Sequence, residues 1–209
     1  MFGNTLSGNA QKTLALLGKS GLVRNAYLAG GSALALHFGN RYSIDFDFFS
    51  REKFDPIKLS VEFKKLGRFK QTTAKGISLI GEFNEIKLSY FQYDYPLIGQ
   101  VIIFNEVNVA SVEDIAAMKL VAIMDRGTKK DFIDLYEIIK QGRSLENILK
   151  LYDKKYHVLT ENLYSLIRSL QYFDDAEISE MPRMIRDTGW SEIKKFIAAE
   201  TIHLAKKYL

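Results

Sequence analysis

The hydrophobic pattern of this chain changes its period once, near residue 110. Before that point, short apolar segments alternate with polar residues and are separated by glycine, asparagine and proline, which is typical of strands and turns. From Ser111 onward, apolar residues recur at helical spacing. The pattern predicts an α+β protein in which a mixed sheet with flanking helices, residues 1–110, is followed by an all-helical half, residues 111–209.

The individual elements follow from the same periodicities and from the residues that begin or end them. We expect Ser32 to lie near a helix N-cap and Gly39 to end that helix. The strands expected in the first part are 27–29, 43–49, 77–83, 85–93 and 101–104, and the helices are 9–20, 32–38 and 57–66. The helices expected in the second part are 111–126, 129–140, 144–152, 158–171 and 190–207.

The composition excludes several classes of protein. The chain of 209 residues has no cysteine, which rules out disulfides and thiolate metal sites. No apolar run approaches the roughly 18 residues of a membrane-spanning helix. We therefore expect a cytoplasmic protein with no membrane partner. The net charge of +4 is a mild bias toward anionic partners such as nucleotides or RNA, and it suits an ordinary slightly basic protein equally well.

Two carboxylates on the strand expected at 43–49 are the strongest indication of chemistry. Asp45 and Asp47 share a face with Ser43, about 6–7 Å apart, and they repel unless a cation or hydrogen bonds separate them. A divalent cation such as Mg²⁺ resolves this repulsion and also bridges substrate phosphates. A solvated strand face is the alternative. The apolar residues of the strand are expected on the opposite, buried face: Ile44, Phe46 and Phe48.

The turn Gly30-Gly31-Ser32 links an apolar strand to a helix. Glycines there let backbone N–H groups approach a phosphate, the helix dipole favours an anion, and the Ser32 hydroxyl adds a donor. Taken alone, the turn is better explained as an ordinary one with a serine cap. A phosphate-binding turn followed by a carboxylate pair is, however, what a nucleotide–metal site requires.

Charged residues also gather on the two helices that follow Ser111. Lys119 and Arg126 are seven residues apart and share a helix face, so they could offer two cations to a triphosphate. Asp131 and Asp134 share a face of the next helix. By spacing alone, a solvated face of ion pairs is the favoured explanation. In the first part of the chain, Arg41 precedes the strand that carries the two aspartates and could also face phosphate. An aromatic cluster in the same part could stack a base or pack within the sheet: Tyr90, Phe91, Tyr93 and Tyr95.

The segment LAGGSALALHFGNRYSIDFDFFS, residues 28–50, resembles the signature of the AbiEii/AbiGii-type nucleotidyltransferases, a branch of the polymerase-beta-like superfamily. That signature is a Gly-Gly-Ser/Thr turn, a short helix, Gly-x-Arg-x-Ser and then Asp-x-Asp. The segments SVEDIAAMKLVAIMDRGTKKDFIDLYEI (111–138) and YFDDAEISEMPRMIRDTGWSEIKKF (172–196) extend the resemblance over most of the chain.

The resemblance implies a nucleotidyltransferase fold and a role for each matching residue. Asp45 and Asp47 would ligate Mg²⁺ or Mn²⁺. Lys119 would contact the triphosphate together with Arg126, and Asp131 would complete the catalytic set. The residues that would hold the nucleotide phosphates are Gly30, Gly31, Ser32, Arg41 and Ser43. Proteins of this family are toxins or defence components that use nucleoside triphosphates, and some modify RNA, including the acceptor end of tRNA.

The chain departs from the superfamily at one position. Many polymerase-beta-like enzymes carry a third carboxylate on a neighbouring strand, which often helps to activate the attacking hydroxyl. The matching strand here places Ser89 at that position. Glu85 has the same strand parity and could substitute for it. Otherwise Asp131 becomes the candidate general base.

These observations predict a Mg²⁺-dependent enzyme that transfers a nucleoside monophosphate from a nucleoside triphosphate to an acceptor hydroxyl. The expected acceptor is RNA, such as tRNA, and the expected biology is that of a toxin or phage-defence protein with a cognate antitoxin. An alternative is a catalytically weakened module that keeps the fold and binds nucleotide or RNA. A third hypothesis is a toxin-like interaction protein whose main partner-binding surface is the helical half, including residues 190–209.

Overall fold

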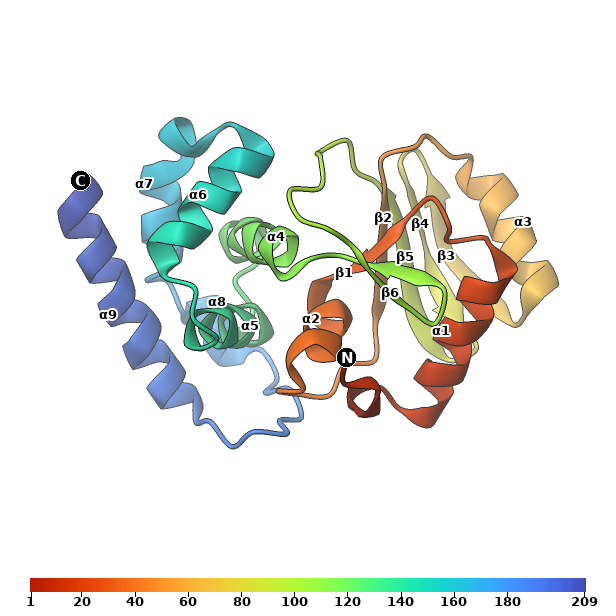
Figure 1. Ribbon diagram of the computed structural model, residues 1–209, viewed down its shortest axis with the longest axis horizontal. Coiled ribbons are helices and arrows are strands. Elements are labelled where there is room, and N and C mark those ends of the chain that lie inside the picture. The colour runs from red at the N-terminus through yellow and green to blue at the C-terminus, as the bar shows by residue number, and fades with distance from the viewer. The chain divides into compact units, whose positions relative to one another are not determined.

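The computed structural model describes all 209 residues, and its packing divides them into a first unit, Met1–Ser111, and a second unit, Val112–Leu209. The first unit holds one mixed sheet of seven strands in the order β3-β4-β5-β2-β1-β7-β6 (Figure 1). The pairs β1–β7 and β2–β5 are parallel, and all others are antiparallel. The strands are β1 (Tyr27–Ala29), β2 (Phe46–Ser50), β3 (Phe69–Lys75), β4 (Ser78–Phe83), β5 (Ile86–Gln92), β6 (Ile102–Phe104) and β7 (Val107–Val109).

Local sequence fixes where the helices of the first unit begin and end. Ser7 caps α1, because its side chain accepts a hydrogen bond from Ala10 N–H, and Asp55 caps α3 in the same way. Gly21 and Gly39 end α1 and α2 in left-handed conformations. These helices are α1 (Gly8–Ser20), α2 (Gly30–Phe38) and α3 (Pro56–Leu66), preceded by the short 3₁₀ helix η1 (Gly3–Thr5).

The two faces of the sheet differ in character. Phe46 and Phe48 of β2 point to a fully buried apolar face, where Phe63 of α3 packs against Phe69 and Phe83. Figure 1 shows α1 and α3 on that side of the sheet. The opposite face carries the alternate residues of the same strands, and these are less completely buried. That second face carries the polar side chains of Asp47 and Ser89 as well as the aromatic rings of Phe49 and Phe91.

The second unit is helical throughout. Its core includes an aromatic cluster in which Phe132 lies 4.9 Å from Phe173 and 6.1 Å from Trp190, measured between ring centroids. A buried ion pair joins Asp114 to Lys155, whose Nζ lies 2.8 Å from the carboxylate. The helices are α4 (Val112–Asp125), α5 (Lys129–Lys140), α6 (Leu145–Tyr156), α7 (Leu159–Ser169), α8 (Asp174–Ile178) and α9 (Trp190–Tyr208).

The expected α+β class, a mixed sheet with flanking helices followed by an all-helical half, is confirmed. Besides the short helix η1, three elements were not expected. Strand β3 lies at a sheet edge and is almost wholly polar, β7 has three residues, and α8 has five, so none shows a clear hydrophobic period. The strand expected to begin at residue 43 begins at Phe46, and Ile44 is not in the core but 58% exposed.

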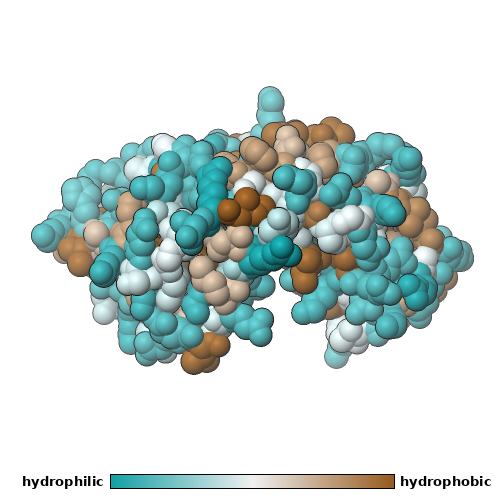
Figure 2. Space-filling model, turned by 90° about the horizontal axis from the view of Figure 1, so that it is seen from below, coloured by the Kyte–Doolittle hydropathy of each residue, from teal (hydrophilic) through white to brown (hydrophobic).

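No helix is both long enough and apolar enough to cross a membrane. Hydrophilic residues cover most of the face drawn in Figure 2, where hydrophobic residues form only small separate groups.

Candidate active site

Asp47 lies in a row of paired residues that crosses four strands of the first unit. Ala29 of β1 and Ser89 of β5 are its direct neighbours, and Ser89 is in turn paired with Ile80 of β4. Directly paired residues point to the same face of a sheet. The Asp47 side chain therefore projects from the sheet between Ala29, the residue that precedes α2, and Ser89.

The first two residues of α2 are glycines because two side chains approach them closely. A Cβ at Gly30 would lie 2.9 Å from Asp47 Oδ2, and a Cβ at Gly31 would overlap the guanidinium of Arg41. Gly30 also has a φ of 67°, which residues with a Cβ rarely adopt. The glycines thus allow a carboxylate and a guanidinium to reach the start of the helix.

Ser32 lies in the first turn of α2, near the N-cap as expected, but it does not cap the helix. Ala29 is the N-cap, because the left-handed turn at Gly30 lets the helix begin directly after β1, and no side chain caps α2. The Ser32 hydroxyl donates instead to the backbone carbonyl of Asp45 and hydrogen bonds to the Ser43 hydroxyl at 2.9 Å. Ser32 therefore fastens the segment before β2 to the helix, while the N–H groups of the first turn have no capping side chain.

The structure brings seven of the predicted site residues together in the first unit. Arg41 is 3% exposed, donates to the carbonyl of Tyr42 at 3.2 Å and lies against the start of α2, as its position before the carboxylate strand suggested. The seven residues are Gly30, Gly31, Ser32, Arg41, Ser43, Asp45 and Asp47.

The two carboxylates of this group suit a hard divalent cation. Asp45 Oδ1 is buried and has no hydrogen-bond partner, which is costly unless another group satisfies it. No third histidine, cysteine or carboxylate completes a protein cage for a metal. Mg²⁺ does not need one, since it commonly takes one or two carboxylates and fills its remaining positions with water and substrate phosphate.

The other three predicted residues form a charged network in the second unit. Lys119 Nζ lies 3.0 Å from Asp131 Oδ1 and 2.6 Å from Asp134 Oδ2, and the lysine side chain is only 5% exposed. The arrangement is therefore a buried network and not the solvated charged face that spacing alone favoured. Two carboxylates thus hold the buried ammonium of Lys119 in a fixed position.

Two further side chains donate hydrogen bonds to Asp131. Arg126 donates to both of its oxygens, through Nε at 3.0 Å and Nη2 at 3.1 Å, and the Thr128 hydroxyl donates at 2.6 Å. Burial by itself would raise the pKa of Asp131, but the charge of Lys119, with Arg126 and Thr128, outweighs it and holds that pKa well below its ordinary value. A carboxylate held in its charged form has a low proton affinity, which argues against Asp131 as a general base.

Glu85 and Thr128 take positions that the sequence alone did not establish. Glu85 does not substitute for a carboxylate at Ser89, because it lies in the turn before β5 and forms an exposed ion pair with Arg68 at 3.1 Å.

Thr128 was not predicted to take part in the charged network. Its position three residues before Asp131 is that of an N-cap residue, and only the structure shows that its hydroxyl turns to the carboxylate.

Several solved structures share the fold of this chain. A putative nucleotidyltransferase from Helicobacter pylori is 18% identical and covers 96% of each chain, with a TM-score of 0.56. JHP933 from Helicobacter pylori is 19% identical, covers 97% of this chain and 94% of its own, and has a TM-score of 0.53. MenT4, a nucleotidyltransferase toxin from Mycobacterium tuberculosis H37Rv, is 14% identical over 93% of this chain and 85% of its own, with a TM-score of 0.56. The fold is that of nucleotidyltransferases.

Sequence comparisons identify the family. The protein aq_aa25 of Aquifex aeolicus (strain VF5) is 37% identical over 194 residues, which are 90% of each chain. Residues 80–203 match the family described as nucleotidyl transferase AbiEii toxin, type IV TA system. The chain belongs to this AbiEii family of nucleotidyltransferase toxins. The matched range contains Lys119, Arg126 and Asp131, whereas the glycine turn and Asp45 and Asp47 precede it.

Proposed function

We propose that this protein is a Mg²⁺-dependent nucleotidyltransferase, with Mn²⁺ as the alternative cation, that transfers a nucleoside monophosphate to an acceptor hydroxyl. The observation that carries the proposal is the placement of Asp47 against Gly30 at the uncapped start of α2, two residues after Asp45, whose buried Oδ1 has no hydrogen-bond partner. A site for a divalent cation and a site for phosphate thereby adjoin each other.

Asp45 and Asp47 would hold the cation. Their oxygen donors fit a hard ion, which when bound neutralises phosphate charge and orients the triphosphate. The backbone N–H groups at the start of α2 would receive phosphate oxygens, helped by the positive end of the helix dipole and by the buried guanidinium of Arg41. Ser32 and Ser43 would keep the segment that carries Asp45 close to those N–H groups.

The proposed reaction is a substitution at the α-phosphorus of the nucleoside triphosphate. The acceptor oxygen forms a bond to that phosphorus, the bond to the bridging oxygen of the β-phosphate breaks, and pyrophosphate leaves. The acceptor hydroxyl loses its proton to solvent or to a base. Neither Ser89 nor the hydrogen-bonded Asp131 suits that role, so positioning and charge neutralisation would supply most of the rate. Lys119 and Arg126 would offset charge on the triphosphate.

We further propose RNA, including tRNA, as the acceptor and a toxin or phage-defence role that a cognate antitoxin controls. Membership in a family of toxins from toxin–antitoxin systems supports the biological part, and the net charge of +4 favours an anionic acceptor.

The test is incubation with each α-³²P-labelled nucleoside triphosphate, Mg²⁺ and total RNA. Wild type should label RNA, and EDTA should prevent it. Asp47→Asn keeps the shape of the side chain and removes its charge, so transfer should fall by roughly a hundredfold or more while the melting temperature changes little. Transfer by Asp47→Asn at the wild-type rate would refute the proposed metal site.

A second candidate is a module that binds nucleotide or RNA without turnover. The neutral Ser89 beside Asp47, where a third carboxylate is common in the superfamily, favours this alternative. Mg²⁺-dependent binding of a nucleoside triphosphate, with no pyrophosphate released across a broad set of acceptors, would identify it.

A further inference from the structure

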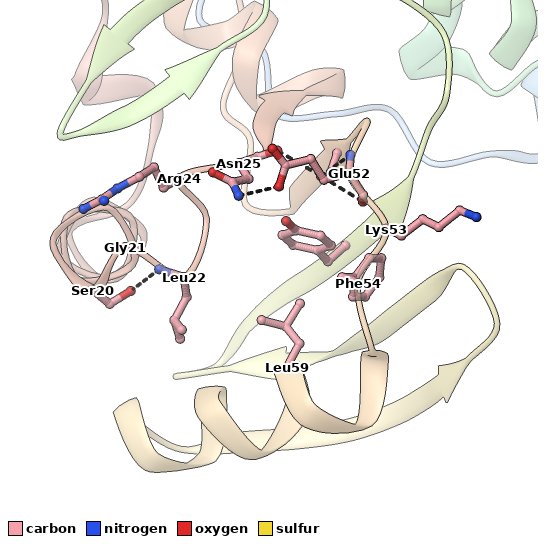
Figure 3. A pocket seen from close by; sticks show the side chains of 11 residues that line it. Ser20, Gly21, Leu22, Arg24, Asn25, Glu52, Lys53, Phe54 and Leu59 are labelled. Carbon is pink, nitrogen blue, oxygen red and sulfur yellow. Dashed lines mark hydrogen bonds between the residues drawn. The ribbon is translucent and has the colours of Figure 1, made fainter.

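A cavity of about 520 Å³ opens in the first unit at the end of β2 that lies away from Asp45 and Asp47 (Figure 3). Ser50, the last residue of β2, lines it, about 10 Å along the strand from Asp47. The two residues also differ in strand parity, so Asp47 points to the opposite face of the sheet. The cavity, which we call the β2-end cleft, is thus separate from the candidate active site.

The centre of the β2-end cleft is apolar and aromatic. Leu22 reaches it from the loop after α1, Leu59 from α3 and Phe54 from the segment between β2 and α3, as Figure 3 shows. The ring of Phe54 stands edge-on to that of Tyr90, with 4.7 Å between the centroids. A flat ring of a ligand can pack against such a surface.

One wall of the cleft is a closed hydrogen-bond network. The Ser50 hydroxyl donates to the carbonyl of Asn25 at 2.9 Å and accepts from Glu52 N–H at 3.1 Å, and Asn25 Nδ2 donates to the Glu52 carboxylate at 2.5 Å. Glu52 is the only carboxylate that lines the cleft. Because Asn25 already hydrogen bonds to the Glu52 carboxylate, the network holds this wall of the cleft in place and lines it with polar groups.

Two cations flank the cleft. Arg24 and Lys53 both line it, and neither forms an ion pair with a carboxylate. Figure 3 shows the two side chains extending from opposite sides of the apolar centre. The acidic and basic residues of the second unit balance, so the net charge of +4 resides in the unit that contains this cleft.

We infer that the β2-end cleft binds an internal nucleotide of a single-stranded nucleic acid, with the base against Phe54 and its two flanking phosphates at Arg24 and Lys53. A free nucleotide carries its charge at one end, whereas a nucleotide within a strand has a phosphate on each side of its base. Cations on both sides of an aromatic surface match the second arrangement.

The inference rests on the proposed function in one respect, since RNA is the proposed acceptor. The cleft would hold a part of the RNA strand distant from the reacting hydroxyl. It is an anchoring site and contributes no group to the substitution at phosphorus.

The test is binding of a fluorescein-labelled single-stranded RNA of ten nucleotides, followed by anisotropy at several salt concentrations. Arg24→Glu/Lys53→Glu should weaken binding by about tenfold or more and lower the salt slope by about 1.4, since each phosphate contact on a single strand contributes about 0.7. The control is Lys12→Glu/Lys75→Glu, which makes the same charge change in the same unit at two exposed, unpaired lysines outside the cleft. It should bind nearly as wild type does.

A second variant separates stacking from charge. Phe54→Ala should weaken binding between about fivefold and a hundredfold with an unchanged salt slope, and Phe54→Trp should restore it. Equal losses in the cleft and control charge variants would overturn the inference. So would tighter binding of a glutamate-rich peptide than of RNA, which indicates a protein partner, or equally tight binding of a nucleoside monophosphate.

Failure of the inference and failure of the proposed function give different results. Asp45→Ala/Asp47→Ala should lose nucleotidyl transfer and keep wild-type affinity for the RNA. If wild type binds RNA through Arg24 and Lys53 but transfers nothing, only the proposed function fails. If wild type transfers label to RNA and Arg24→Glu/Lys53→Glu binds RNA as tightly as wild type, only the cleft assignment fails.

Discussion

Ser89 lies directly beside Asp47, paired with it across the parallel strands β5 and β2. A serine at this point leaves Asp47 with a neutral neighbour on that side. A carboxylate there would face Asp47 on the same side of the sheet, where like charges destabilise each other. The identity of residue 89 therefore controls how much negative charge the candidate metal site contains.

Ser89→Asp should lower stability in EDTA by about 1 kcal/mol through this repulsion, and Mg²⁺ should restore more stability to the variant than to wild type. Thermal unfolding in EDTA and in Mg²⁺ provides the measurement. Ser89→Asn is the control, since it has the same size without the charge. If Ser89→Asp and Ser89→Asn respond alike to Mg²⁺, residue 89 does not face the cation site.

Gly30→Ala should destabilise the first unit by more than the conformational cost of its positive φ. That cost is about 1–2 kcal/mol for a left-handed residue. The new methyl group would also press on Asp47 Oδ2. Gly76→Ala is the matched control, because Gly76 has a φ of 60° and no atom within 4 Å of a Cβ. Urea unfolding of the two variants should show the larger loss at Gly30, and equal losses would contradict the close approach of Asp47.

Asp131→Asn should destabilise the second unit by about 3–5 kcal/mol, because it leaves the buried ammonium of Lys119 without one of its two carboxylates and Arg126 without its partner. Asp125→Asn, at an exposed position on the neighbouring helix, should change stability by less than about 0.5 kcal/mol. Chemical denaturation of both variants provides the comparison. A small effect at Asp131 would mean that the network is open to solvent.

Acid should weaken the second unit through the same carboxylate. The pKa of Asp131 is lowered in the folded state, so the unfolded chain takes up its proton first as the pH falls. The stability from this group is complete well above the unfolded pKa of about 3.9 and is lost as the pH falls below it. The urea midpoint should fall between pH 6 and pH 3, and less steeply in Asp131→Asn. Parallel curves for the two proteins would assign the acid sensitivity to other groups.

The sequence predicted those parts of the candidate site that depend on strand parity. It did not predict the positions of side chains that tertiary contacts determine. Parity placed Asp47 on the same face as Ser89 of the matching strand, whereas Asp45 precedes β2. Ser32 does not cap α2, because the left-handed turn at Gly30 starts the helix early. Glu85 also had the correct parity, but a tight turn and an ion pair with Arg68 hold it elsewhere. Strand parity predicts which face of the sheet a side chain occupies, but not how far along the strand that side chain lies from the site.

The charged network required the structure for a different reason. Lys119, Arg126 and Asp131 are spaced as a solvated helix surface would be, and spacing does not reveal burial. Lys119 is enclosed because α4 and α5 turn their charged positions toward each other. The β2-end cleft was unpredictable on the same grounds. Arg24, Phe54 and Tyr90 come from three separate segments that only the sheet order brings together.

The network around Asp131 closes within one helical hairpin, over a sequence separation of only 12 residues between Lys119 and Asp131. The row Ala29–Asp47–Ser89 instead requires three strands from distant parts of the chain to pair. Local contacts close small loops and form quickly, whereas non-local strand pairing is slow. During refolding, the lysine and arginine of the hairpin should reach their native positions before the carboxylates meet the glycine turn. A newly made chain would therefore complete the Lys119–Asp131 network first and the candidate metal site last.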